Sequence, residues 1–282
     1  MKRIGIVAMV AAAIGLAALA ASSVAAAAGS PEYLACGKAA KSKETKKYTG
    51  HYSNKECSEV SATNEGKYER VASTKFPVKT KAKFGETTIY LYNPLEHKTV
   101  SEVPCKTGAA SGTINNATEG TVTLTYKGCN VPEKFKNGEK AQFAGACNSP
   151  GKKKEEVVTE QLTTKLVWLD EAETVPGVIL EPTTPGGTFE SVECLAGIVK
   201  VRQYGSILAD LTPAGSLPKV LTATLNANTE TGEPEFGSYW SSGTQTEVKL
   251  LSEIHAPNIE EPGVPTSEVS AIPLKDGKVL VN

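Results

Sequence analysis

Hydrophobic and polar residues alternate most regularly in residues 120–129. Val122, Leu124 and Tyr126 fall on one side of an extended backbone, and the threonines between them fall on the other side. This period of two is typical of a β-strand with one buried face. The segment ends at a glycine and a cysteine, so the sequence predicts a sheet that disulfides stabilise.

Short alternating segments with turn residues between them follow along most of the chain. Their number and spacing predict an all-β protein, built as an antiparallel β-sandwich or a flattened barrel. The expected strands are 88–92, 100–105, 111–115, 121–126, 176–180, 188–195, 198–208, 221–225 and 248–254, with an edge strand near 278–281.

Two further segments are harder to interpret. Residues 157–169 fit both a helical and an extended pattern, and their many β-branched side chains favour a strand. Residues 257–265 contain three prolines and several acidic residues, so we expect an irregular stretch there.

The N-terminus has the three parts of a secretory signal peptide. Lys2 and Arg3 precede a long apolar run, and small residues follow it up to Ala28. We therefore expect residues 1–28 to be removed and the protein to be secreted, either into the medium or onto the cell surface. No second apolar segment reaches the ~18 residues of a membrane span, so no transmembrane anchor is expected in the mature form.

The mature chain is expected to divide into two parts. Residues 29–66 form a small lysine-rich unit, and residues 67–282 form the β-sandwich domain. Five lysines lie within residues 38–47. Such a run suits contact with an anionic cell-wall polymer, although most charge runs are solvated connections.

Six cysteines allow three disulfides in fifteen possible connectivities. Pairing by proximity in sequence predicts Cys36 with Cys57 and Cys129 with Cys147. That choice leaves Cys105 to pair with Cys194. A leucine and an alanine precede Cys36, which also suggests an alternative in which this cysteine carries a lipid.

The charged residues exclude one class of partner. The chain has 30 basic and 31 acidic residues, with a net charge of -1. Nucleic-acid binding requires a strong basic surplus, so no nucleic-acid partner is expected.

No arrangement of residues predicts catalysis, a metal or a cofactor. His51, His97 and His255 lie far apart in sequence without a second ligand at metal-binding spacing. Acidic clusters occur at Asp170, Glu171 and Glu173 and again at residues 260–261, and paired carboxylates are the catalytic groups of glycosidases. Acids on polar turns are usually solvated, so we expect no enzyme and no cofactor.

Tyr239 and Trp240 are the candidate ligand-binding residues. They lie between short Gly/Ser segments, and exposed aromatic pairs of this kind stack on sugar rings. The alternative is that they are core aromatics at the end of a strand.

Several short motifs carry a resemblance to a known family. They are Leu34-Ala35-Cys36-Gly37-Lys38, Tyr48-Thr49-Gly50-His51-Tyr52, Lys55-Glu56-Cys57 and Glu65-Gly66-Lys67-Tyr68-Glu69, with Lys127-Gly128-Cys129 and Cys194 later in the chain. In these motifs the chain resembles a paralogue-rich family of uncharacterised secreted proteins from soil actinobacteria. The resemblance implies export and an all-β fold, and it implies no activity.

These observations together predict a secreted or cell-surface protein with a non-enzymatic binding or structural role. Its partner would be a cell-wall polymer or a glycan. The alternatives are an extracellular hydrolase that uses acidic residues and a lipid-anchored envelope protein.

Overall fold

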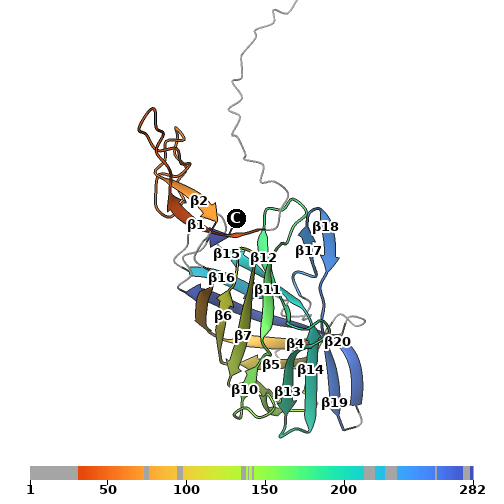
Figure 1. Ribbon diagram of the computed structural model, residues 1–282. Coiled ribbons are helices and arrows are strands. Elements are labelled where there is room, and N and C mark those ends of the chain that lie inside the picture. Colours follow the sequence, from red (N-terminus) through yellow and green to blue (C-terminus); the bar gives the residue numbers. More distant parts are fainter. Residues whose placement is uncertain are drawn as a thin grey trace, which may run out of the picture.

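All regular elements of the described chain are β-strands, which confirms the all-β class (Figure 1). The computed structural model describes residues 31–72, 76–93, 98–134, 138, 140–141, 143–212, 220–225, 234–257, 259–275 and 280–281. The expected signal peptide lies outside these residues. The segment with the clearest alternation is β7 (Glu119–Lys127), in which Leu124 and Tyr126 are fully buried and the threonines are half-buried.

Eight antiparallel strands form a closed ring, which is the flattened barrel of the prediction. Around the ring, β20 returns to β3 through the pairing of Lys275 with Lys81. The order is β3 (Val78–Phe84), β6 (Thr107–Ile114), β7, β11 (Leu162–Trp168), β12 (Pro176–Pro182), β15 (Ile207–Thr212), β16 (Val220–Leu225) and β20 (Ile259–Lys275).

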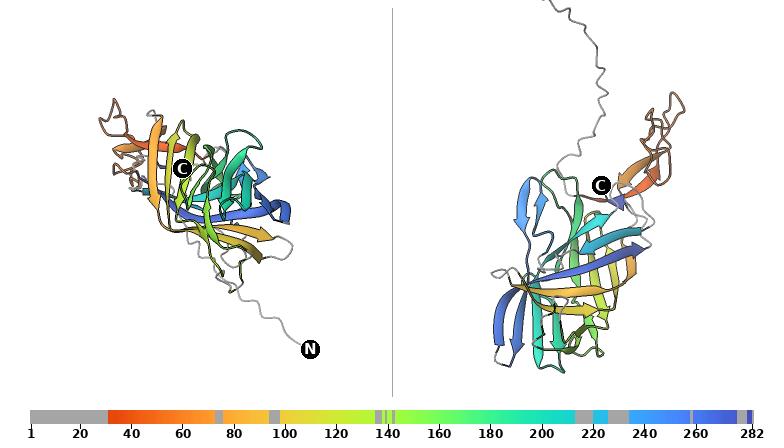
Figure 2. Two further views of the ribbon diagram at one scale, coloured as in Figure 1. Left: turned by 90° about the horizontal axis from the view of Figure 1, so that it is seen from below. Right: turned by 180° about the vertical axis from the view of Figure 1, so that it is seen from behind.

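A second curved sheet continues from the first half of β20, as Figure 2 shows. In that half β20 pairs with β19 on one side and with β4 on the other, whereas its second half belongs to the barrel. The sheet contains β5 (Lys98–Cys105), β4 (Thr87–Asn93), β20, β19 (Leu250–Ala256), β14 (Val199–Gly205), β13 (Thr188–Cys194), β9 (Gly145–Asn148) and β8 (Asn130–Val131).

The expectation of an irregular stretch at residues 257–265 is therefore wrong. β20 starts at Ile259 and extends through Pro262 and Pro265. Its register with β19 shifts between Ser252 and Ile254, opposite Glu261 and Val264. A proline lacks the N–H that a regular ladder needs, and a shift of this kind accommodates Pro262 without breaking the strand.

Two segments that were each expected as one strand are divided. Residues 157–169 are extended, as favoured, but they form β10 (Glu156–Val158) and β11. Residues 198–208 form β14 and β15 with a break at Gly205, whose φ of 96° is in the left-handed region. β14 and β15 thus join different sheets, whereas β10 and β11 both pair with β7.

The small N-terminal unit lies at one end of the barrel (Figure 1). Its sheet consists of β1 (Tyr33–Lys38), β2 (Tyr68–Ala72) and β21 (Leu280–Val281). β2 pairs with β1 along its length, from Tyr68 to Ala72, and the boundary between the two parts at residue 66 stays a prediction. The described part of the expected C-terminal edge strand is β21, which pairs with β1.

The disulfide between Cys36 and Cys57 is present in this unit, as predicted. The other two predicted pairs are wrong, because Cys105 is bonded to Cys129 and Cys147 to Cys194. The β8–β9 hairpin does bring Cys129 and Cys147 together, and the Cys147 amide donates to the Cys129 carbonyl at 3.0 Å. However, Cys194 on β13 lies directly opposite Cys147, so each hairpin cysteine bonds to a strand outside the hairpin.

Candidate functional site

The barrel encloses a cavity of about 60 Å³ between its inner faces. Its walls come from seven barrel strands and from Tyr33 of β1, and none of the described residues that line it is charged. Alanines lie where larger side chains would fill the centre. The lining residues are Tyr33, Thr80, Ala110, Thr113, Ile114, Thr121, Val122, Leu124, Thr164, Val178, Leu180, Ala209, Leu211, Ala223 and Leu225.

Two glycines explain why the barrel wall can curve tightly beside this cavity. A Cβ on Gly112 would lie 2.2 Å from the carbonyl oxygen of Thr121, and a Cβ on Gly120 would lie 2.5 Å from that of Thr113. Neighbouring backbone therefore occupies the space of any side chain at these positions. The glycines allow this curvature and leave the inner wall without side chains there.

Tyr33 closes the cavity at the end of the barrel where β6 turns into β7. Its side chain is 4% exposed, and its backbone amide donates to the Ala117 carbonyl at 2.6 Å. Burial raises the pKa of the Tyr33 phenol far above its ordinary value, so the hydroxyl stays neutral. A neutral phenol is compatible with an uncharged group beside it.

The hydroxyl-bearing side chains of the lining lie near this same end. Thr80 pairs in register with Gly112, and Thr164 pairs with Gly120, both within three residues of the β6–β7 connection. Ala110 and Leu124 form a register pair farther from that end. The cavity is therefore amphipathic, with neutral polar groups toward Tyr33 and apolar groups deeper inside.

The second sheet has a buried polar row. Glu190, Gln203 and Ser252 occupy matched register positions on β13, β14 and β19, and none is more than 2% exposed. Glu102 on β5 is buried as well. Because these carboxyl groups are closed off from solvent, the row does not form an open active site.

Tyr239 and Trp240 lie on the hairpin of β17 (Ser238–Ser241) and β18 (Thr244–Glu247), and both are half-buried. Tyr239 packs against a small apolar cluster on the outer face of the barrel, formed by Val167, Ile179, Leu208 and Val248. Trp240 lies in register with Trp168 of β11. The hairpin thus agrees with the alternative of aromatics at a strand, packed against the barrel.

The acidic cluster after β11 forms a turn. Asp170 accepts hydrogen bonds from the Thr174 and Val175 amides at 2.8 and 2.7 Å, and from the Thr174 hydroxyl at 2.6 Å. Burial raises the pKa of Asp170, but these hydrogen bonds outweigh it and hold the pKa below its ordinary value. Glu173 accepts from the Gly243 amide at 3.1 Å, whereas Glu171 is exposed. These contacts order the loop and the tip of the β17–β18 hairpin.

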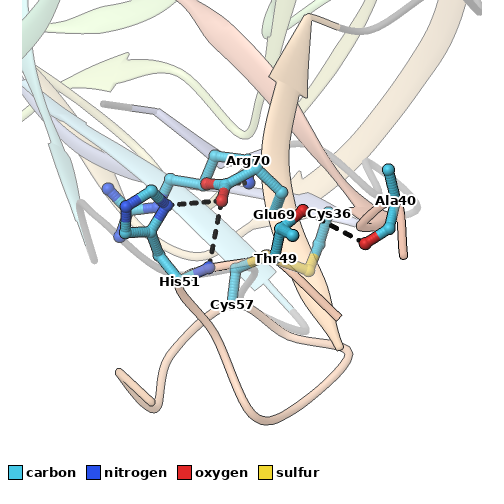
Figure 3. A network of polar contacts seen from close by, with 7 residues as sticks. All are labelled: Cys36, Ala40, Thr49, His51, Cys57, Glu69 and Arg70. Carbon is cyan, nitrogen blue, oxygen red and sulfur yellow. Dashed lines mark hydrogen bonds and ion pairs between the residues drawn. A yellow bond between two sulfur atoms is a disulfide. The ribbon is translucent and has the colours of Figure 1, made fainter. Parts of the chain in front are cut away.

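The described histidines lie in separate parts of the fold. His51 contacts Glu69 in the N-terminal unit, where Nδ1 lies 2.5 Å from Oε2 and the His51 amide donates to the same oxygen at 3.0 Å (Figure 3). His255 is exposed on β19, and His97 lies outside the described residues. Within the described ranges, no group of three or more His, Cys, Asp or Glu residues could hold a metal ion.

The described chain has no helix with the length and hydropathy of a membrane span. Its three disulfides are compatible with an oxidising exterior.

Sequence reasoning missed the cavity. A signal for it exists in β6, where Gly108, Ala110 and Gly112 occupy successive inward positions. Such small residues at alternate positions of a strand leave space inside a barrel.

No family model matches the chain, and no curated protein or solved structure matches it either. The resemblance to secreted actinobacterial proteins stays a prediction.

Proposed function

We propose that this protein is a secreted, non-enzymatic binding protein whose ligand is a short aliphatic molecule with an uncharged polar end. The amphipathic cavity inside the barrel carries this proposal. An eight-stranded barrel is wide enough either to be filled by side chains or to hold one small ligand. Here alanines and glycines stand at inner positions, so the interior is not filled.

The character of the lining supports this ligand class. Binding pockets are mostly apolar, with a few placed polar groups that orient the ligand. Leu124, Leu180 and Leu211 supply apolar surface, while Tyr33 and Thr164 supply neutral hydroxyls. A carboxylate would be desolvated here without a cation to pair with, so a neutral alcohol fits better than a fatty acid.

The alternative functions have less support. A lipid anchor would need the sulfur of Cys36, which is bonded to Cys57 (Figure 3). A hydrolase would need accessible acids, and Asp170 and Glu173 instead hold backbone amides of a turn and a hairpin. Tyr239 packs on the barrel, which leaves a smaller aromatic surface for a sugar than the pair would offer.

Calorimetric titration with the 1-alkanols from methanol to butanol tests the proposal. Each methylene buried should add about 0.8 kcal/mol, or about fourfold in affinity, until the cavity is full. The matching fatty acids should bind more weakly. Absence of saturable binding, or an affinity that is independent of chain length, would overturn the proposal.

A further inference from the structure

Three lysines form a regular row on the outside of the barrel. Lys79, Lys81 and Lys83 are exposed at alternate positions of β3. Successive lysines of an antiparallel strand are about 6.8 Å apart in this arrangement. Thr80 and Ala82 between the lysines and Phe84 after them are buried. Because side chains alternate along a strand, the three lysines face the outside of the barrel.

The strands beside β3 present small side chains to this row. Across β6, the register places Thr113, Ser111 and Ala109 opposite the three lysines. The next strand, β7, continues the rows with Thr121, Thr123 and Thr125. Figure 1 shows β6 and β7 side by side on the outside of the barrel. The lysine row thus borders a surface of hydroxyl groups, and none of the facing residues is acidic.

Some cations elsewhere on the sheets have acidic partners. Arg202 lies 3.6 Å from Glu253, and Lys200 lies 3.9 Å from Glu193. In the part of the chain that the structure describes, the β3 lysines have no such ion pair.

On the other side of β3, β20 places Lys275 at the register position of Lys81. This register continues the row of basic residues onto the next strand.

We propose that the outer face of β3, β6 and β7 binds a linear acidic polysaccharide. Its carboxylates would pair with Lys79, Lys81 and Lys83, and its sugar hydroxyls would exchange hydrogen bonds with Ser111 and Thr123. Thr and Ser hydroxyls both donate and accept, which suits the hydroxyl groups of a sugar chain. The five residues that would contact the polysaccharide do not line the cavity, so this site does not depend on it.

The surface favours a polysaccharide over a single-stranded nucleic acid. Proteins that bind single strands stack the bases on aromatic side chains, and none of the residues in these three rows is aromatic. The chain's net charge of -1 also lacks the basic surplus of nucleic-acid binders.

Binding of the full chain to polygalacturonate, measured by calorimetry at several salt concentrations, tests this site. Dextran is the neutral comparison. The test variant combines Lys79→Gln, Lys81→Gln and Lys83→Gln. The control combines Lys152→Gln, Lys153→Gln and Lys154→Gln, which removes the same charge from an exposed turn elsewhere. Circular dichroism and a cooperative urea transition establish that both variants fold.

We expect the unchanged protein to bind polygalacturonate and not dextran. The β3 variant should bind roughly tenfold more weakly, because three exposed ion pairs are lost. The slope of log affinity against log salt concentration should fall by up to about 2. The turn variant should bind like the unchanged protein.

Three results would overturn the proposal. One is the absence of binding to polygalacturonate, and another is equal weakening in both variants. The third is tighter binding to single-stranded DNA than to the polysaccharide. If the β3 variant does not fold, Lys81→Gln alone replaces it, with an expected loss of about threefold.

Discussion

Replacing Ala110 by valine should fill part of the barrel cavity. Ala110 is 4% exposed on β6 and lines the cavity. Its neighbour Ala109 points to the outside of the same strand and is half-buried. Ala109→Val is therefore a matched control, because both variants gain the strand preference of valine but only one gains volume inside.

The expected gain follows from the size of the cavity. Unfilled volume costs about 24 cal/mol per Å³, so 60 Å³ corresponds to about 1.4 kcal/mol. The two added methyl groups are worth about 1.6 kcal/mol if they are buried without strain. We therefore expect Ala110→Val to raise the free energy of unfolding by ~1.5 kcal/mol relative to Ala109→Val. Propanol should bind roughly tenfold more weakly, since the same volume is no longer free.

Urea unfolding and calorimetry measure both effects. An increase in the urea midpoint with an unchanged m-value reports a gain in stability alone. If Ala110→Val instead lowers the free energy of unfolding by more than ~1 kcal/mol, the interior at this position is already full. In that case the cavity is too small for the proposed ligand.

Three other predictions concern the fold. Gly112→Ala should cost ~2 kcal/mol because its Cβ meets the Thr121 carbonyl, whereas Gly85→Ala, with open space around it, should change stability by less than ~1 kcal/mol in urea unfolding. Removing the Cys147–Cys194 disulfide with two alanines should lower the free energy of unfolding by about 4 kcal/mol, given its 47-residue separation, and a loss below ~1 kcal/mol would contradict the loop-entropy argument. Burial, with a smaller contribution from Glu235, raises the pKa of Asp210. The protonated Asp210 carboxyl therefore contributes to the stability of the fold at pH values below its ordinary pKa. This contribution is lost as the pH rises through the raised pKa. Asp210→Asn should therefore stabilise the protein at neutral pH and not below about pH 3, and equal effects at both pH values would refute this.

Local alternation was enough to predict the class of fold and the buried side of β7. The shared face of Val122, Leu124 and Tyr126 follows from the period of a strand alone. Predicting it required no information about the neighbouring strands. The same pattern in β3 was overlooked, because its outward residues are lysines and its inward residues include Thr80 and Ala82. A strand with small or polar inward residues gives a weak hydrophobic signal.

Features that depend on strand neighbours could not be predicted in this way. Cys129 and Cys147 are close in sequence and in space, yet the strands outside their hairpin determine their bonds. The cavity depends on eight strands meeting in one order, which no single segment encodes. Glu190 was missed for the same reason, because it lies between Gln203 of β14 and Thr159, which are distant in sequence.

The position of β20 has a consequence for the order in which the protein forms. This strand closes the barrel between β16 and β3, although it follows β3 by more than 170 positions in the chain. Until residues 259–275 have been synthesised, β3 and β16 are open edges whose backbone groups can pair with another chain. Contacts between such distant segments also slow folding. The chain is thus most prone to aggregation in the interval before β20 pairs with β3 and β16. A chaperone that shields open sheet edges would act in that interval.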